Sequence, residues 1–176
     1  MITYVSHLPC AGETIKGSHF QTGFGGKGAN QAVQIGRLAN VDNFVRFIGK
    51  VGQDLIGMET RQNFVKNFVD VNCLLVADDP EVPSGVASIS VDAQGENCIV
   101  IVGGANDMLT ANEANASMAS HVHCNSLYLL VQLESPLEAT LAAMRVAKAQ
   151  GTKVSMTLMA YSVLLCYPIV AMFGEC

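Results

Sequence analysis

Charged residues are scarce in this chain, and no excess of basic residues is present. Asp, Glu, Lys and Arg make up 14% of its 176 residues, and the formal net charge at pH 7 is −5. Because a general nucleic-acid surface needs a basic face, this balance argues against DNA or RNA as a partner. It leaves room for a phosphorylated ligand held by a few local lysines. Half of the residues are hydrophobic, so we expect a folded domain with a real core.

Cysteine pairs at redox or metal-ligand spacing are also absent. The six cysteines include no C-x-x-C pair, so buried or free thiols in a reducing, cytoplasmic compartment are predicted. The first residues lack the basic region and apolar run of a signal peptide. His121, His123 and Cys124 invite a metal hypothesis, but no second ligand pair accompanies them, and we predict no metal site.

One long segment, residues 154–174, carries no charge. Its length would permit a membrane span. However, residues 154–156 are needed as a strand, Pro168 interrupts the segment, and no Lys or Arg follows it. We therefore predict no membrane partner and interpret residues 157–176 as a divergent apolar tail.

Glycine, in contrast, is concentrated in one place: Gly23, Gly25, Gly26 and Gly28 stand within six residues. Glycine loses more freedom on folding than any other residue, so such a cluster is typical of a loop that something approaches closely. A helical pattern follows at residues 28–38. A loop that opens a helix presents unpaired N–H groups to a ligand, here beside Lys27.

Three interpretations of this loop compete. Gly23, Gly25 and Gly28 fit the dinucleotide fingerprint, but mostly polar residues precede them, and Arg46 stands near the position where an acid is expected. A phosphate-binding P-loop is excluded because Gly28 follows Lys27, where Ser or Thr is needed. The third interpretation is a loop that uses glycine only to turn into a helix. The loop residues alone do not separate this interpretation from a ligand site.

Strand and helix patterns alternate along the chain, which predicts an α/β fold with a mostly parallel sheet covered by helices. The expected helices span residues 28–38, 54–68, 110–120 and 135–150, and the expected strands span 44–48, 71–77, 127–133 and 154–156. Residues 49–54 are expected to form a loop, and the apolar run 127–133 predicts a strand buried on both faces.

Local signals refine these elements. Thr110 with Glu113, and Ser135 with Glu138, predict capping boxes at two helix starts, the second with Pro136 at its first helical position. The inward faces of the second and fourth helices are expected to carry Leu55, Met58, Phe64, Val65 and Phe68, and Leu137, Leu141, Met144 and Ala147. Residues 85–91 and 98–102 predict a hairpin with a polar turn, and residues 13–24 suit exposed strands.

Six motifs in order resemble the ribokinase/phosphofructokinase-B family of sugar kinases. The resemblance runs from about residue 4 to 154. Its motifs are PCAGETIKG (9–17), GGKGANQA (25–32), VGQD with Gly57 (51–57), GEN (95–97), GAN (104–106) and QLESPLE (132–138). Several motifs in the right order are far more specific than any one of them.

The resemblance implies a ribokinase-like domain over residues 1–156, with a small β-hairpin lid formed by strands at about 13–24 and 85–102. The lid covers the sugar and, in many members, forms a homodimer contact. The resemblance also assigns the substrate-binding residues Gly26, Lys27, Gly28, Ala29, Asn30 and Glu134, with Asn30 bonding sugar hydroxyls. Without the resemblance, Glu134 could be any carboxylate near a helix start.

The activity implied is ATP-dependent phosphorylation of a sugar hydroxyl, with Mg²⁺ and K⁺ as further cofactors. The match around residues 9–38 favours the 5-hydroxyl of D-ribose over fructose or adenosine. The family's catalytic base lies in a Gly-Ala-Gly-Asp motif, and no Gly-x-Gly-Asp string occurs here. The family's first strand and its magnesium and potassium motifs have no match either.

We therefore assign no catalytic residue, expect a fold incomplete at both ends, and predict that the 176-residue chain is inactive alone. A non-catalytic fragment that binds sugar or dimerises is the alternative. A second alternative is a kinase of the same family for another sugar or a nucleoside.

Overall fold

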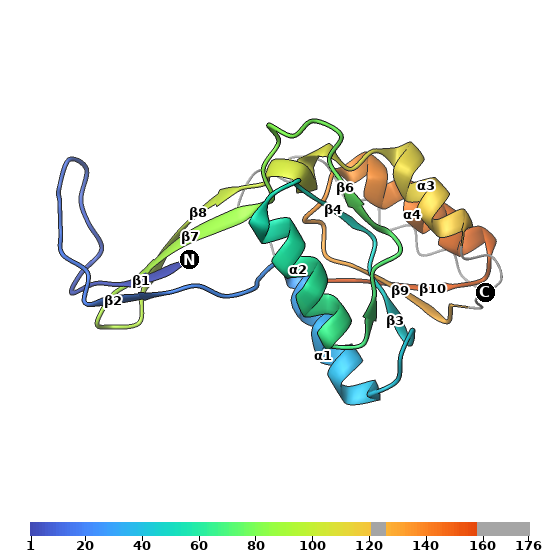
Figure 1. Ribbon diagram of the computed structural model, residues 1–176, viewed down its shortest axis with the longest axis horizontal. Helices are drawn as coiled ribbons and strands as arrows, with labels where there is room; N and C mark the ends of the chain where they lie inside the picture. The colour runs from blue at the N-terminus through green and yellow to red at the C-terminus, as the bar shows by residue number, and fades with distance from the viewer. Residues whose placement is uncertain (121–125, 158–176) are drawn as a thin grey trace.

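The structure, a computed structural model, describes residues 1–120 and 126–157, which form a body and a projecting lid (Figure 1). The lid is a four-stranded sheet in the order β2-β1-β7-β8. Its strands are β1 (Ile2–Tyr4), β2 (His19–Gln21), β7 (Val86–Val91) and β8 (Asn97–Val102). Only 19–21 of the residues predicted as lid strands at 13–24 form a strand. The sequence analysis missed β1, because three residues are too short for a period-two pattern.

The hairpin predicted within the lid is confirmed. Strands β7 and β8 pair antiparallel, from Val86 opposite Val102 to Val91 opposite Asn97. The turn between them is closed by the Asp92 carboxylate, which accepts from the backbone N–H groups of Gln94 and Glu96, both at 2.9 Å. Strand β1 extends the sheet by pairing parallel with β7 and antiparallel with β2.

The body consists of short parallel strand pairs between helices. Strand β3 pairs with β5, β4 with β6, and β9 with β10, each in parallel, which confirms the predicted α/β class. The strands are β3 (Val45–Arg46), β4 (Gly49–Val51), β5 (Val69–Asp70), β6 (Leu74–Val76), β9 (Tyr128–Val131) and β10 (Lys153–Met156). The helices are α1 (Lys27–Ala39), α2 (Leu55–Lys66), α3 (Ala111–Ala119) and α4 (Leu137–Ala149), with a 3₁₀ helix η1 (Gly104–Met108).

Two helix pairs lie on opposite sides of these strands (Figure 1). On one side, α1 and α2 bury Ala32 and Phe64 against Val51, Val69 and Leu74. On the other side, α3 and α4 pack closely, with small residues at the contact: Ala114 on α3, and Ala139, Ala142, Ala143 and Ala147 on α4. The large side chains expected inward on α4 therefore do not form its buried face, and Leu137 is 55% exposed.

Three other local predictions are wrong for identifiable reasons. Residues 49–51, expected in a loop, form strand β4 because they pair with β6. On helix α2 the predicted Phe64 is buried with Gly57, but Leu55, Met58 and Val65, also expected inward, are 53–61% exposed. Strand β9 is not buried on both faces, since Tyr128 is 61% exposed and, among the described residues, the strand pairs only with β10.

Helix starts were predicted with mixed success. The capping box of α3 is present, with Thr110 and Glu113 bonded reciprocally. The box expected at Ser135 is not formed: its hydroxyl lies 3.1 Å from the Thr140 hydroxyl, and Pro136 occupies the N-cap position. A proline in the cap position has no side-chain acceptor, so α4 begins without a side-chain cap.

One carboxylate ties the lid to the body. Asp54, the N-cap of α2, accepts from the Gly57 N–H at 2.8 Å, from the Ser84 hydroxyl at 2.6 Å and from the Ser84 N–H at 2.7 Å. The Ser84 hydroxyl in turn accepts from the Gly52 N–H at 2.9 Å. Because Ser84 lies two residues before β7, the first strand of the hairpin, this network fixes where that strand leaves the body.

The backbone at this junction is packed so closely that glycine is required. A Cβ on Gly52 would lie 2.5 Å from the Ser84 nitrogen, and one on Gly104, which has φ +53°, would lie 2.3 Å from the Pro83 oxygen. The Pro83 oxygen also accepts from the Ala105 N–H at 2.8 Å. The two ends of the lid hairpin are thereby joined to each other at its root.

Partial burial by itself raises the pKa of Asp54, but the hydrogen bonds from Ser84 and Gly57 outweigh it and hold the pKa below its ordinary value. A depressed carboxyl pKa means that the folded state binds the proton more weakly than the unfolded chain does. Its stabilising contribution is therefore complete above the unfolded pKa and is lost as pH falls through the folded one.

We predict that Asp54→Asn lowers the free energy of unfolding by about 1–3 kcal/mol at neutral pH, because an NH₂ group would face the Ser84 N–H. Urea denaturation from pH 7 to pH 3 measures this effect. The deficit of the variant should begin to shrink below about pH 4, the ordinary pKa of an aspartate in the unfolded chain, and should shrink further as pH falls through the lower pKa of folded Asp54. Glu59→Gln, which removes an exposed charge from the same helix, is the control. A deficit equal to that of the control would contradict the prediction.

Candidate functional site

Helix α1 begins without a cap of its own. Its N-cap residue is Gly26, with φ 87° and no side-chain cap bond. The Glu134 carboxylate supplies the missing acceptor: Oε2 accepts from the Lys27 backbone N–H at 2.7 Å, and Oε1 accepts from Lys27 Nζ at 2.8 Å. Glu134 thus satisfies a donor at the helix start and forms an ion pair with the side chain of the same residue.

Both partners of this ion pair are partly buried, with 30% of the Lys27 side chain and 27% of the Glu134 side chain exposed. Glu134 follows β9 after a bend at Leu133, whose φ is 58°. The carboxylate therefore sits beyond the carboxyl end of a parallel strand, where open α/β sheets place their ligand groups. A carboxylate acceptor beside an ammonium donor can bond several hydroxyls of a polar ligand.

A second contact holds the same two segments together. Gln132 Nε2 donates to Gln31 Oε1 at 2.6 Å. Gly28 leaves the space that this contact needs, because a Cβ there would lie 2.7 Å from Gln132 Oε1. Gln31 and Gln132 were not predicted as site residues, although both stand inside the motifs GGKGANQA and QLESPLE. Their roles depend on which neighbour each side chain reaches, which the motifs do not specify.

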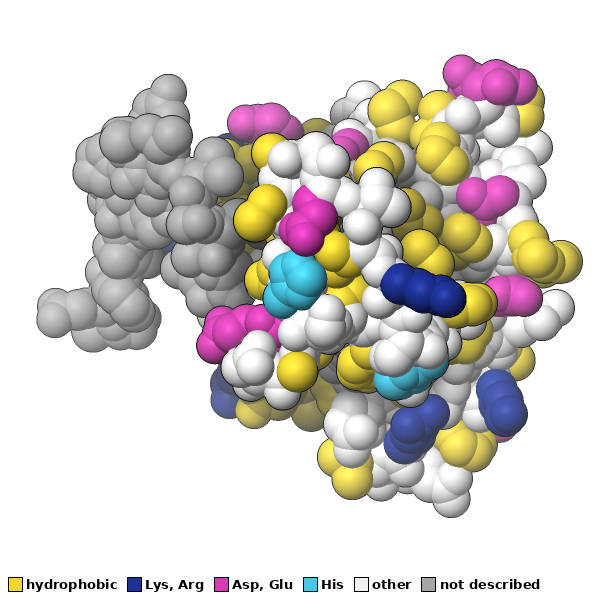
Figure 2. Space-filling model, turned by 90° about the vertical axis from the view of Figure 1, so that its left-hand side faces the viewer, with side chains coloured by type: hydrophobic (Ala, Val, Ile, Leu, Met, Phe, Trp, Pro, Cys, Tyr) yellow, Lys and Arg dark blue, Asp and Glu magenta, His cyan; other side chains and the backbone are white. Residues whose placement is uncertain are grey.

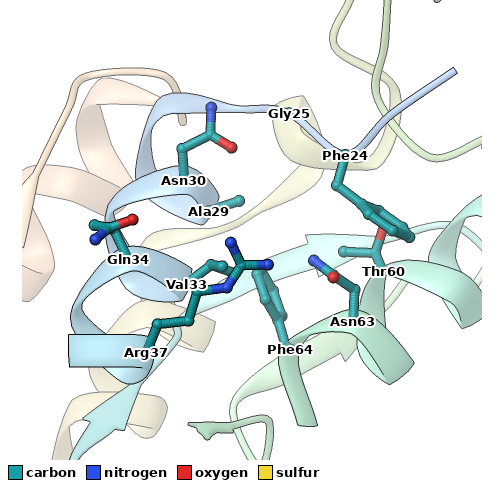
Figure 3. A pocket seen from close by; sticks show the side chains of 10 residues that line it. All are labelled: Phe24, Gly25, Ala29, Asn30, Val33, Gln34, Arg37, Thr60, Asn63 and Phe64. Atoms are coloured by element: carbon teal, nitrogen blue, oxygen red, sulfur yellow. The ribbon is translucent and has the colours of Figure 1, made fainter. Parts of the chain in front are cut away.

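The residues predicted as one site lie on two flanks of α1. Lys27 and Gly28 face the end of β9, where Glu134 and Gln132 lie. Ala29 and Asn30 instead line a cavity of about 390 Å³ between α1 and α2 (Figure 3). Its full lining is Phe24, Gly25, Ala29, Asn30, Val33, Gln34, Arg37, Thr60, Asn63 and Phe64.

The lid exposes a row of apolar side chains. Figure 2 views the molecule from the end where the lid projects and shows hydrophobic side chains among charged ones and histidines. On β8, Ile99, Val100, Ile101 and Val102 are 46–63% exposed. Such a strand offers an apolar surface to a partner, which is the feature that a lid-mediated contact would need.

Membrane and metal features were sought in residues 1–120 and 126–157. No helix there has the length and apolarity to cross a membrane. Nor do those residues bring three His, Cys, Asp or Glu side chains together in a metal-binding group. His121, His123, Cys124 and the tail at 158–176 lie outside the described residues.

Comparison with known proteins adds independent observations. The family described as pfkB family carbohydrate kinase matches residues 1–166. A ribokinase from Dictyostelium discoideum is 43% identical over 145 residues, which is 82% of this chain and 43% of that protein. The structure of a ribokinase from Giardia lamblia superposes with a TM-score of 0.79 at 30% identity, over 92% of this chain and 49% of that one.

A third similar protein was solved with ligands. The Arabidopsis thaliana ribokinase complexed with ribose and ATP superposes with a TM-score of 0.72 at 25% identity, over 90% of this chain and 50% of that one. The chain spans about half the length of the curated relatives it matches.

We predict an energetic coupling of about 0.5–1.5 kcal/mol between Lys27 and Glu134, because the pair is partly shielded from water and its carboxylate also caps a helix. A double-mutant cycle of Lys27→Met and Glu134→Gln, followed by urea denaturation, measures it. Salt at 1 M should reduce the coupling. A parallel cycle of Glu59→Gln and Lys66→Gln, two exposed residues of α2, should give none. Equal coupling in both cycles would contradict the prediction.

Proposed function

The chain belongs to the pfkB family of carbohydrate kinases, and from that premise we propose that it carries the sugar-binding part of an ATP-dependent kinase for the 5-hydroxyl of D-ribose. The observation that carries the proposal is the contact of Glu134 with both the backbone and the side chain of Lys27. This contact supports Gly26, Lys27 and Glu134 as substrate-binding residues. Gly28, Ala29 and Asn30 complete the proposed substrate-binding set from the motif resemblance alone.

Sugar binding here follows from the chemistry of the ion pair. A hydroxyl that enters beside Glu134 donates to its carboxylate, while the Lys27 ammonium donates to a hydroxyl or ring oxygen of the same sugar. Gly26 lets the ligand approach the backbone at the helix start, because no Cβ occupies the space there, whereas the space at Gly28 is taken by Gln132. Asn30 is proposed as a sugar ligand from the resemblance alone, since its side chain lines the cavity on the other flank of α1.

Ribose is favoured as the substrate because the ribokinases of Dictyostelium discoideum and Giardia lamblia, and the Arabidopsis thaliana ribokinase bound to ribose and ATP, are similar over most of this chain. A different sugar or a nucleoside remains the alternative substrate class. Specificity depends on every group around the sugar, and the contacts described cover only part of its surface.

ATP is proposed as a cofactor because the Arabidopsis thaliana ribokinase was solved with ribose and ATP, and Mg²⁺ and K⁺ are proposed from the motif resemblance alone. The described residues do not fit these groups by themselves: no metal-binding cluster occurs among residues 1–120 and 126–157, and the Lys27 N–H at the glycine-rich helix start is already bonded to Glu134. We therefore derive no phosphoryl-transfer step from them and propose that this 176-residue chain does not phosphorylate ribose alone.

The domain organisation remains a proposal as well, with residues 1–156 as the kinase part and 157–176 as a divergent tail. A non-catalytic role as a sugar-binding or dimerising fragment is the second candidate function. It is favoured by the exposed apolar side chains of β8, which suit a homodimer contact through the lid.

The purified chain tests the proposal when ribose binding and ATP-dependent ribose phosphorylation are measured together. We expect ribose binding by ligand-observed NMR, no phosphorylation, and at least about tenfold weaker binding in Glu134→Gln, which loses the charged acceptor. Lys66→Gln is the control. Phosphorylation that Glu134→Gln abolishes would refute the proposed inactivity. Absence of ribose binding would refute the sugar site. The remaining candidate would then be the dimerising fragment, and analytical sedimentation measures whether the chain forms a dimer.

A further inference from the structure

The cavity between α1 and α2 has a chemistry that the sugar site does not explain. Its lining combines one cation, four neutral polar side chains and two aromatic rings, and it includes no Asp or Glu. Its volume of about 390 Å³ falls within the usual range for small-molecule sites. It lies on the flank of α1 opposite the contacts that Glu134 and Gln132 make with the helix start.

The cation of this cavity is an exposed arginine oriented by one hydrogen bond to a buried side chain. Arg37 donates through Nε to Asn67 Oδ1 at 2.6 Å. Asn67 is buried, with 7% exposed, and its own amide donates to the Asn63 carbonyl at 2.6 Å and to Asn63 Oδ1 at 3.1 Å. This relay uses only the Nε of the guanidinium and leaves its two terminal nitrogens directed toward the space between the helices (Figure 3).

No acidic side chain neutralises Arg37 within the described part of the chain, where the ion pairs involve Lys27, Arg46, Lys50 and His7 instead. A guanidinium with two parallel N–H donors matches a carboxylate or a phosphate in a bidentate fashion. The cation and its geometry therefore select an anion.

The other residues that line the cavity favour an anion that carries an apolar group. Phe24, which is 54% exposed, supplies aromatic surface, and Asn30, Thr60 and Asn63 supply hydrogen-bonding groups around it. The cavity closes where α1 meets the end of α2, because a Cβ on Gly36 would lie 2.1 Å from the Asn67 carbonyl oxygen. The helices leave room only on the Phe24 side of that contact.

We propose that this cavity binds a small organic anion, a carboxylate or phosphate carried on an aromatic or other apolar ring, with Arg37 as its charge partner. The ligand would also contact Phe24 and Asn30, on either side of the segment that positions Lys27. Its binding would therefore hold the start of α1 and would be coupled to the ion pair with Glu134. The proposal does not depend on the kinase assignment, since it rests on the lining of the cavity alone.

Titration of the whole chain with benzoate, followed by amide chemical-shift NMR, tests the proposal. Benzoate has the anion and the ring, and we expect saturable binding with a Kd of about 1 mM, typical of a ligand of this size. The shifts should map to residues 29–37 and 60–64. Benzamide lacks the charge and inorganic phosphate lacks the ring, so each should bind at least about tenfold more weakly. Equal binding by either probe would overturn the proposed ligand class.

Two variants, each with a matched control, assign the site. Arg37→Gln should weaken benzoate binding about tenfold or more, whereas Lys66→Gln, which removes an exposed cation from α2 outside the lining, should leave it unchanged. Gln34→Glu places a carboxylate in the cavity without altering Arg37 and should also weaken binding. Gln62→Glu makes the same charge change at an exposed position outside the lining.

Equal effects in a variant and its control, or shifts confined to Lys27 and Glu134, would overturn the proposal. Ribose titrated in the same samples separates this result from the proposed function. If ribose binds and benzoate does not, only the anion site is refuted. If benzoate binds and ribose does not, only the sugar site is refuted.

Discussion

The carboxylate of Glu134 is the constraint on which the arrangement of this chain depends. It joins two segments that are 107 residues apart, the start of α1 and the end of β9. A helix that begins at glycine has no side-chain acceptor of its own, so the distant carboxylate both completes the helix and fixes the ammonium of Lys27. The contact between Gln132 and Gln31 repeats the connection one turn along the helix. These two contacts together hold the start of α1 against the carboxyl end of β9.

The fold class and several local elements were predictable from local patterns and motif order. Helix α1, the lid hairpin, the Thr110 capping box and the cap of α2 at Asp54 each depend on neighbours within a few residues, and the structure confirms them. The buried faces of α2 and α4 were not predictable in the same way. Phe64 and Ala147 were predicted to face inward and are buried. The other core contacts of these helices are made by Gly57 and by alanines, at points where the neighbouring elements approach closely. Hydrophobic periodicity ranks large residues above small ones and therefore does not single out these small residues.

The candidate site likewise has features that the sequence predicted and features that it did not. The motifs placed Lys27 and Glu134 in one predicted substrate-binding set, and the two residues are in contact in the structure, while their role in binding stays a prediction. They did not indicate that Ala29 and Asn30 would lie on the other flank of the helix, nor that Arg37, nearly two turns further on, would share a cavity with them. A run of consecutive residues in a helix turns through every direction, so a sequence motif at a helix start can serve two separate surfaces.

The root of the lid has a mechanical consequence. The hairpin leaves the body where Pro83 and Ser84 bond Ala105, Asp54 and Gly52, and its strands then extend well away from the body (Figure 1). This arrangement is a lever with a short, stiff base and a long arm. A small change of angle at Ser84 is multiplied along the strands, so the far turn at Gly95 moves much further than the base does. The rigidity of a few closely packed backbone atoms thus sets the positional accuracy of a surface far from them.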